Sequence, residues 1–358
     1  MSLRPLLRTQ DGSIVSADGR VLFFSAERFA RDICEGKCCF LCGAYPADAE
    51  FNDEHILPNW VLRRFKLHGH TIVLPNGRTH RYGSYTIPCC VSCNSLLGDT
   101  IEAPLSQVLA GGHEAVCQHI QSEGSYRLFV WLALIFLKMH LKDASLREHA
   151  NHKDGDATIA AAAEYAWGVF HHLHCLVRSV YTRAAVAPEA YGSLVVLSAG
   201  GRDTAEDFDL IDLSAAQTLV IRMGNFALCA VFDDSCAVIN GLKDVIERIE
   251  GSLSFIQIRE FAAHMACCNL HLQNRPQFRT CVENATPPRV SIAAHHDASP
   301  SFATRDKNLF GHLMERVLHS SLGHIHVEGR TPEELAALVR AGEISFLFDD
   351  DGRFIART

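Results

Sequence analysis

Four cysteines in two closely spaced pairs are the strongest chemical signal in the sequence. Cys39 and Cys42 form one Cys-x2-Cys pair, and Cys90 and Cys93 form a second. Each such turn can present two thiolates to one ion, and two turns complete the tetrahedral site that structural zinc prefers. We therefore expect a structural Zn²⁺ on these four thiols, with Cys38 and Cys89 outside its shell. The alternative is that the four are buried free thiols.

A Glu-His pair lies between the two cysteine pairs and could serve hydrolysis. Glu54 and His55 are followed by Ile-Leu-Pro, and Asn94 directly follows the second cysteine pair. A neutral histidine is a suitable general base near pH 7, and carboxylate and amide oxygens suit Mg²⁺ or Mn²⁺. Asn94 could instead cap a helix. Glu102, eight residues after Asn94, is a further candidate ligand, or else a capping or salt-bridge residue.

Positive charge gathers in the same part of the chain. The formal net charge of the whole chain is −8, yet no Asp or Glu occurs between His55 and Gly98. The basic residues of this stretch are Arg63, Arg64, Lys66, Arg78 and Arg81. Because phosphate binding depends on a local basic surface, we expect these five side chains to contact nucleic acid. The alternative is a chance gap in acidic residues.

The order of these motifs resembles that of the HNH nucleases, which have the ββα-metal fold. The resemblance covers residues 36–110 and consists of Cys-x2-Cys, Glu-His-Ile-x-Pro and Cys-x2-Cys-Asn-x3-Gly. It implies that His55 is the general base and that Glu54 and Asn94 hold a catalytic divalent ion. Two features depart from the family pattern. Ser84, Tyr85 and Thr86 stand where the family has a middle Asn, and Gly98 stands where some members have a further ligand.

Length and composition indicate an ordinary globular chain of the α+β class. The chain has 358 residues, of which 48% are hydrophobic and 21% charged. At roughly 150 residues per domain, two or three domains are expected. We expect a small zinc-stabilised ββα-metal domain, followed by a larger, mainly helical domain with β-hairpins. The expected segments are a β/helix segment at 1–36, the nuclease domain at 37–110, a helical α+β domain at 111–290, and a linker with a helix-hairpin segment at 291–358.

Hydrophobic periodicity and turn residues predict the individual elements. A strand segment at 13–24 should precede a helix capped by Ser25, and Asn76-Gly77 should turn a hairpin at 71–82. Further helices are expected at 94–109, 126–141, 159–183, 242–250 and 254–273. A hairpin is expected at 218–232, a strand at 236–240, a linker at 282–307, a helix after the capping box that begins at Thr331, and a hairpin at 344–356. The histidines at 171, 172 and 174 should be structural.

These features lead to one expected function and two alternatives. We expect a metal-dependent endonuclease that hydrolyses phosphodiester bonds, with DNA as the expected substrate, in the manner of defence, restriction-type or mobile-element nucleases. The alternatives are a non-catalytic zinc-stabilised module that binds nucleic acid or protein, and a sensor with a decayed nuclease domain. The later domain should serve target recognition, regulation or self-association, with a second copy or a regulatory protein as partner.

The sequence also bears on the compartment in which the protein works. The N-terminus lacks the apolar core of a signal peptide. The longest apolar run, at 128–137, would reach about 15 Å as a helix, half of a bilayer core. The expectation is therefore a cytoplasmic protein with reduced cysteines and no membrane partner.

Overall fold

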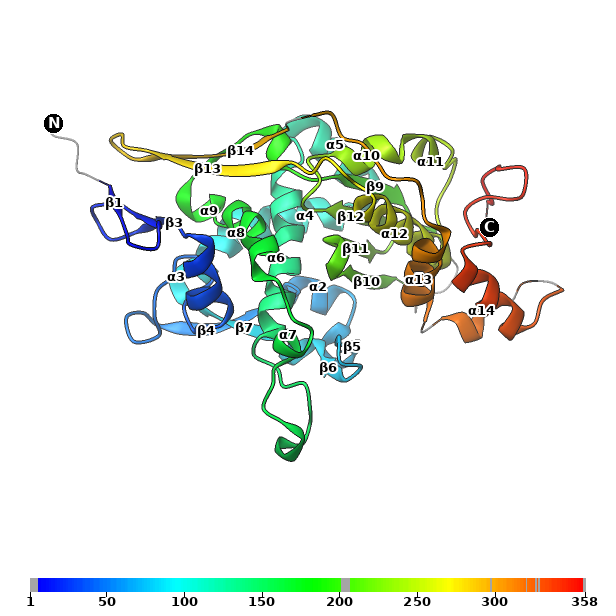
Figure 1. Cartoon of the computed structure of the whole chain (residues 1–358), viewed down its shortest axis with the longest axis horizontal. Helices are drawn as coiled ribbons and strands as arrows, with labels where there is room; N and C mark the ends of the chain where they lie inside the picture. Colours follow the sequence, from blue (N-terminus) through cyan, green and yellow to red (C-terminus); the bar gives the residue numbers. More distant parts are fainter. Residues whose placement is uncertain are drawn as a thin grey trace. The chain divides into compact units, whose positions relative to one another are not determined.

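The structure of the chain is a computed structural model that describes residues 6–200, 207–296, 298–319, 321–325, 327 and 329–356 (Figure 1). Helices and strands are both abundant, which agrees with the expected α+β class. The chain forms two compact units that interleave along the sequence. The first comprises Met1–Gln107, Tyr126–Ala190 and Phe278–Ala294, and the second comprises Val108–Ser125, Tyr191–Gln277 and His295–Thr358. Residues 126–190, expected in a later domain, thus belong to the unit that contains the cysteine pairs.

The first unit begins with a small antiparallel sheet and a short helix. The sheet contains β1 (Leu7–Arg8), β2 (Ile14–Val15) and β3 (Val21–Phe23). Helix α1 (Ala26–Arg28) continues as a π-helical turn (Phe29–Cys34), and the Ser25 side chain accepts the Arg28 N–H as predicted. Gly36 follows this helix because a Cβ there would lie 2.2 Å from the Asp32 carbonyl oxygen.

Two antiparallel strands and the helix that follows them hold the candidate residues. Strand β4 (Phe51–His55) pairs with β7 (Thr86–Cys90), which places Glu54 opposite Ile87 and His55 opposite Thr86. Helix α3 (Val91–Leu97) begins directly after β7 and packs against both strands. It runs on through a π-helical turn (Gly98–Glu102) into α4 (Ala103–Ala110), which confirms the helical stretch expected at 94–109.

The loop between β4 and β7 has a structure of its own. It contains α2 (Asn59–Arg64) and the hairpin of β5 (Thr71–Val73) and β6 (Thr79–Arg81). Gly77, in the turn of this hairpin, has a φ of 76°, a conformation that glycine adopts without strain. The predicted Asn-Gly hairpin is therefore confirmed.

The apolar helix α6 (Tyr126–Asp143) is the centre of the first unit. Every residue from Leu128 to Leu141 is buried, and the helix packs against α8 (His171–Val177). The single helix expected at 159–183 is wrong. The chain instead forms α7 (Ile159–Ala162), a 3-10 turn (Trp167–Phe170), α8 and α9 (Ser179–Thr182). Helix α7 ends because Glu164 adopts a φ of 49°, which no helix interior contains.

The linker expected at 282–307 is wrong over its first part. Strands β13 (Gln277–Glu283) and β14 (Arg289–His295) lie next to each other in a three-stranded sheet, and β14 also pairs in parallel with β8 (Ala185–Val186). The Ala- and Ser-rich composition suggested a loop. However, Val290 and Ile292 alternate along β14 and are both buried, and this burial stabilises a strand.

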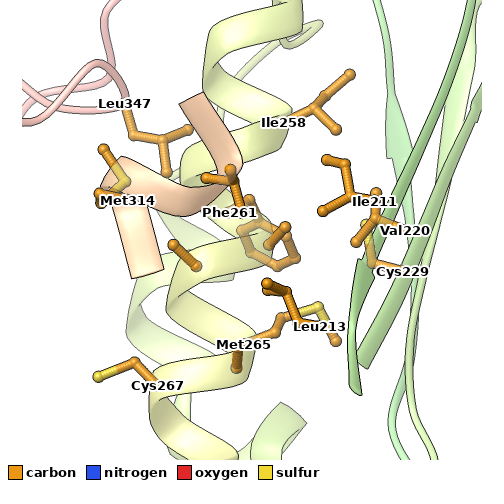
Figure 2. Packing of buried hydrophobic residues seen from close by; sticks show 14 of the residues in the cluster. Ile211, Leu213, Val220, Cys229, Ile258, Phe261, Met265, Cys267, Met314 and Leu347 are labelled. Carbon is orange, nitrogen blue, oxygen red and sulfur yellow. The ribbon is translucent and has the colours of Figure 1, made fainter. Parts of the chain in front are cut away.

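The second unit is a four-stranded antiparallel sheet covered by helices. The strand order is β10 (Phe208–Leu213), β11 (Thr218–Met223), β12 (Phe226–Val231) and β9 (Leu194–Ser198). Phe261 and Met265 of α12 (Phe255–Leu270) face Leu213 and Val220 of the sheet (Figure 2). Helix α13 (Lys307–Leu318) packs on α12, and α14 (Pro332–Ala341) packs on α13. The remaining helices of this unit are α5 (Gly112–Glu123), α10 (Ala237–Gly241) and α11 (Lys243–Glu247).

Two expectations for the second unit differ from the structure. The strand expected at 236–240 is wrong, since Asp234 accepts the Val238 N–H at 2.7 Å and α10 begins there. The hairpin expected at 344–356 is reduced to a single antiparallel bridge between Phe348 and Phe354. Buried Glu260 of α12 accepts the Leu347 N–H at 2.9 Å, so the side chains of α12 bind backbone groups that a longer hairpin would have paired.

Helix length and apolar character also bear on whether the chain could cross a membrane. Among the described residues, no single helix has both the length and the apolar character that a membrane span needs, and α5 and α6 meet the requirement only when counted together.

Candidate functional site

The four thiols of the two cysteine pairs converge on one point. The Sγ atoms of Cys39, Cys42, Cys90 and Cys93 all lie within 4.8 Å of one another. One pair comes from the turn after the first helix, and the other comes from the end of β7 and the start of α3. Three of the four are buried and Cys42 is half-buried. The predicted four-cysteine cluster is therefore confirmed, and it can hold a metal ion such as zinc.

Hydrogen bonds among the clustered thiols shift their pKa values in opposite directions. Hydrogen bonds from Cys42, Cys89 and Cys93 lower the pKa of the Cys39 thiol. The hydrogen bond to Cys39 raises the pKa of Cys42 to about 12, and the bond to the same thiol raises the pKa of Cys93. A Zn²⁺ bound to the cluster would stabilise the thiolate form of its ligands.

Helix α8 holds the backbone of the first cysteine pair. The His174 ring is hydrogen-bonded through Nε2 to the Phe40 carbonyl at 2.8 Å, and Arg178 Nε donates to the Leu41 carbonyl at 2.6 Å. Burial lowers the pKa of His174 well below its usual value and that of Arg178 to about 10. His174 is therefore neutral and structural, as expected. Arg178 was not identified from the sequence, in which a basic residue in an apolar helix has no visible partner.

The Glu54 carboxylate binds a lysine from α6. Lys138 Nζ lies 2.6 Å from Glu54 Oε1 and also donates to the His55 backbone carbonyl at 2.7 Å. Lys138 is only 1% exposed and Glu54 only 7%. Sequence reasoning missed Lys138, because it directly follows the longest apolar run of the chain and its partner is 84 positions away.

Glu102 completes a group of three charged side chains. Burial raises the pKa of Glu102 to about 7, while the positive charge of Lys138 lowers it and the negative charge of Glu54 raises it. Glu102 thus interacts electrostatically with both members of the Glu54–Lys138 pair. We call the buried residues Glu54 and Lys138, together with half-buried Glu102, the buried charge cluster.

Asn94 is the middle residue of α3 and contacts β4. The helix begins at Val91, and its N-cap position is Cys90, so the alternative that Asn94 caps the helix is wrong. The Asn94 side-chain amide donates to Asn52 Oδ1 at 2.9 Å. This hydrogen bond ties α3 to β4.

A catalytic Mg²⁺ or Mn²⁺ does not fit the side chains that were expected to bind it. The Glu54 carboxylate already has a full positive charge at 2.6 Å, and the Asn94 amide is bonded to Asn52. In the described part of the chain, the four cysteines are the one set of three or more His, Cys, Asp or Glu side chains gathered closely enough to hold an ion. Glu54 and Asn94 are therefore engaged by protein partners and are not arranged as ligands of a divalent ion.

His55 lies at the end of β4 and is half-buried. Its backbone is fixed on both sides, because Lys138 binds its carbonyl and the next residue, Ile56, donates its N–H to the Tyr85 carbonyl at 3.0 Å. Two hydrogen bonds therefore hold the backbone at the end of β4 in place.

The five basic residues are all exposed and lie on two neighbouring elements. Arg63 and Arg64 form the last turn of α2, and Lys66 follows that helix in a left-handed conformation. Arg78 and Arg81 belong to the β5–β6 hairpin. The 3-10 turn Leu67–Gly69 connects the two elements. Their contact with nucleic acid stays a prediction.

Comparison with known proteins gives no match for this chain. No protein-family model, no curated protein and no solved structure matches it. The resemblance to the HNH nucleases therefore depends on the sequence motifs.

Proposed function

We propose that this protein is a phosphodiester hydrolase of the HNH type that acts on nucleic acid, with DNA as the expected substrate. One observation carries the proposal. The antiparallel pair β4–β7 and helix α3 form a two-strand-and-helix unit that joins the four-cysteine cluster to the strand end with Glu54 and His55. The HNH motifs occur along the chain in the same order: a Cys-x2-Cys pair, the Glu-His strand end, a second Cys-x2-Cys pair and a helix.

The proposed reaction uses His55 as the general base. The His55 ring accepts a proton from a water molecule while the water oxygen forms a bond to phosphorus. The bond from phosphorus to the 3′ oxygen then breaks, and the leaving oxygen takes a proton from solvent. Exposed Arg63 and Arg64 hold flanking phosphates and position the strand without reading its sequence. Zinc on the four cysteines has a structural role.

Substitution of His55 tests this proposal. His55→Ala should lower cleavage of a supercoiled plasmid or a labelled oligonucleotide by about 10²–10⁴-fold, because it removes the general base. Zinc content and thermal stability should not change, since His55 lies outside the four-cysteine cluster. His70→Ala is the matched control, because His70 is an exposed histidine of the same loop. Full cleavage by His55→Ala would refute the assignment.

A second function is favoured by the buried charge cluster. Glu54 is paired with an internal lysine and is screened from solvent, as befits a structural residue. The protein would then be a zinc-stabilised module that binds nucleic acid without cleaving it. Salt-dependent DNA binding, with no cleavage of single- or double-stranded DNA or RNA in Mg²⁺, Mn²⁺ or EDTA, would identify this function.

A further inference from the structure

We propose that Lys138, and not a divalent cation, is the counter-ion of Glu54, and that Lys138 thereby positions His55. The counter-ion assignment stands on the geometry of the Glu54–Lys138 pair. The positioning role rests on the proposed function, because it matters only if His55 takes part in a reaction.

The burial of Lys138 shows that its charge has a specific partner. The side chain leaves an apolar helix and is 1% exposed, where an unpaired ammonium would be strongly unfavourable. Its Nζ meets the Glu54 carboxylate at 2.6 Å and the His55 carbonyl at 2.7 Å. An ammonium has three N–H donors, so these two bonds satisfy most of its capacity. The Glu54 carboxylate is thus neutralised from within the protein.

A divalent ion at Glu54 would conflict with this arrangement. The ion and the ammonium would both lie within about 4 Å of one carboxylate, and their mutual repulsion is strong in a site that excludes water. Lys138 could leave only by breaking its bond to the His55 carbonyl as well. The group that neutralises Glu54 is therefore also the group that fixes the backbone of the proposed base.

Removing Lys138 should leave Glu54 available to a metal ion. Glu54 binds Lys138 directly at 2.6 Å, and Glu102 interacts electrostatically with both residues. Without the ammonium, the buried Glu54 carboxylate would have no counter-ion, and a divalent ion could recruit Glu102 as a second carboxylate. Two carboxylates are a common basis for binding Mg²⁺ or Mn²⁺.

Binding of Mn²⁺ to the full-length protein, measured by electron paramagnetic resonance, tests the counter-ion assignment. The wild-type protein should show no Mn²⁺ binding that Glu54→Gln removes. Lys138→Met should bind Mn²⁺ at least tenfold more tightly than wild type, and the double variant with Glu54→Gln should lose this gain. Lys243→Met, at an exposed lysine of α11, is the control and should gain no site.

Two outcomes of the binding experiment would overturn the assignment. One is Mn²⁺ binding by the wild-type protein that Glu54→Gln weakens, since Glu54 would then bind the ion with Lys138 in place. The other is a folded Lys138→Met variant that binds no Mn²⁺. The comparison of wild type with Glu54→Gln remains decisive if Lys138→Met does not fold. These results do not depend on cleavage, so they stand apart from the His55→Ala test.

The positioning role has a kinetic test. Lys138→Met should lower kcat at least tenfold with little change in KM, because the strand end with His55 is displaced while the exposed arginines are untouched. Lys138→Arg should restore part of kcat. Unchanged kcat in Lys138→Met would overturn the positioning role.

Discussion

The four-cysteine cluster and the buried charge cluster both include residues of the β4–β7–α3 part of the first unit, but they are assembled in opposite ways. Each half of the cysteine cluster comes from residues three positions apart, so the ligands are visible as two short motifs. The charge cluster joins β4 to a lysine 84 positions away. Local spacing therefore reveals a site that binds an external ion, whereas a site whose cation is supplied by the protein leaves no local pattern.

The largest expected effect is the loss of the metal from the cysteine cluster. Cys93→Ser should abolish zinc binding and unfold the β4–β7–α3 part of the first unit, because binding to such sites contributes roughly 10–16 kcal/mol to folding in zinc-finger peptides. Elemental analysis and circular dichroism would measure both changes. Cys281→Ser, at the exposed cysteine of β13, should leave zinc content and melting unchanged. Purified wild-type protein without zinc would refute the site.

The next largest effect is expected on stability when the Glu54–Lys138 ion pair of the buried charge cluster is removed. Lys138→Met should destabilise the protein by about 3–5 kcal/mol, since it leaves Glu54 buried without its partner. The double variant with Glu54→Gln should recover much of this loss, because no unpaired charge remains at that position. Urea denaturation of the four proteins in this cycle gives the interaction energy. Additive effects of the two substitutions would show that the pair is not coupled.

The pH dependence of stability should depend on Glu102. Its folded pKa of about 7 lies above the usual glutamate value of 4.5, so its stabilising contribution is complete below pH 4.5 and is lost as the pH rises through 7. The glutamine side chain of Glu102→Gln does not titrate. The stability of this variant relative to wild type should therefore increase as the pH rises from 4.5 to 7, by up to about 3 kcal/mol. Denaturation at pH 4.5 and 8 would measure the gain, with Glu27→Gln as an exposed control. A pH-independent difference would contradict this origin.

The smallest expected effect is on nucleic-acid binding. Arg63→Ala combined with Arg64→Ala should weaken DNA binding and reduce the slope of log affinity against log salt by about 0.9 for each phosphate that the protein no longer neutralises. Fluorescence anisotropy at several salt concentrations would measure the slope. Arg279→Ala, at an exposed arginine of β13, should leave it unchanged. An unchanged slope in the double variant would place the DNA-binding surface elsewhere.

Several elements could be predicted from the sequence because their determinants are local. The Asn76-Gly77 turn and the capping box of Thr331 and Glu334 each depend on residues within one turn of chain, and both form as predicted. The two Cys-x2-Cys pairs belong to the same class. In each case the physical cause, a backbone conformation or a ligand spacing, is contained in a few consecutive residues.

Only the tertiary structure decided the partners of buried polar groups and the pairing of distant strands. Residues 282–295 looked like a linker, yet most of them form strands because β8 and β14 meet in one sheet. Glu54 looked like a metal ligand, yet it meets Lys138 because α6 packs beside β7 and brings an ammonium to the same interior point. Which charges meet in an interior depends on contacts between segments far apart in the chain. No spacing within either segment encodes that contact.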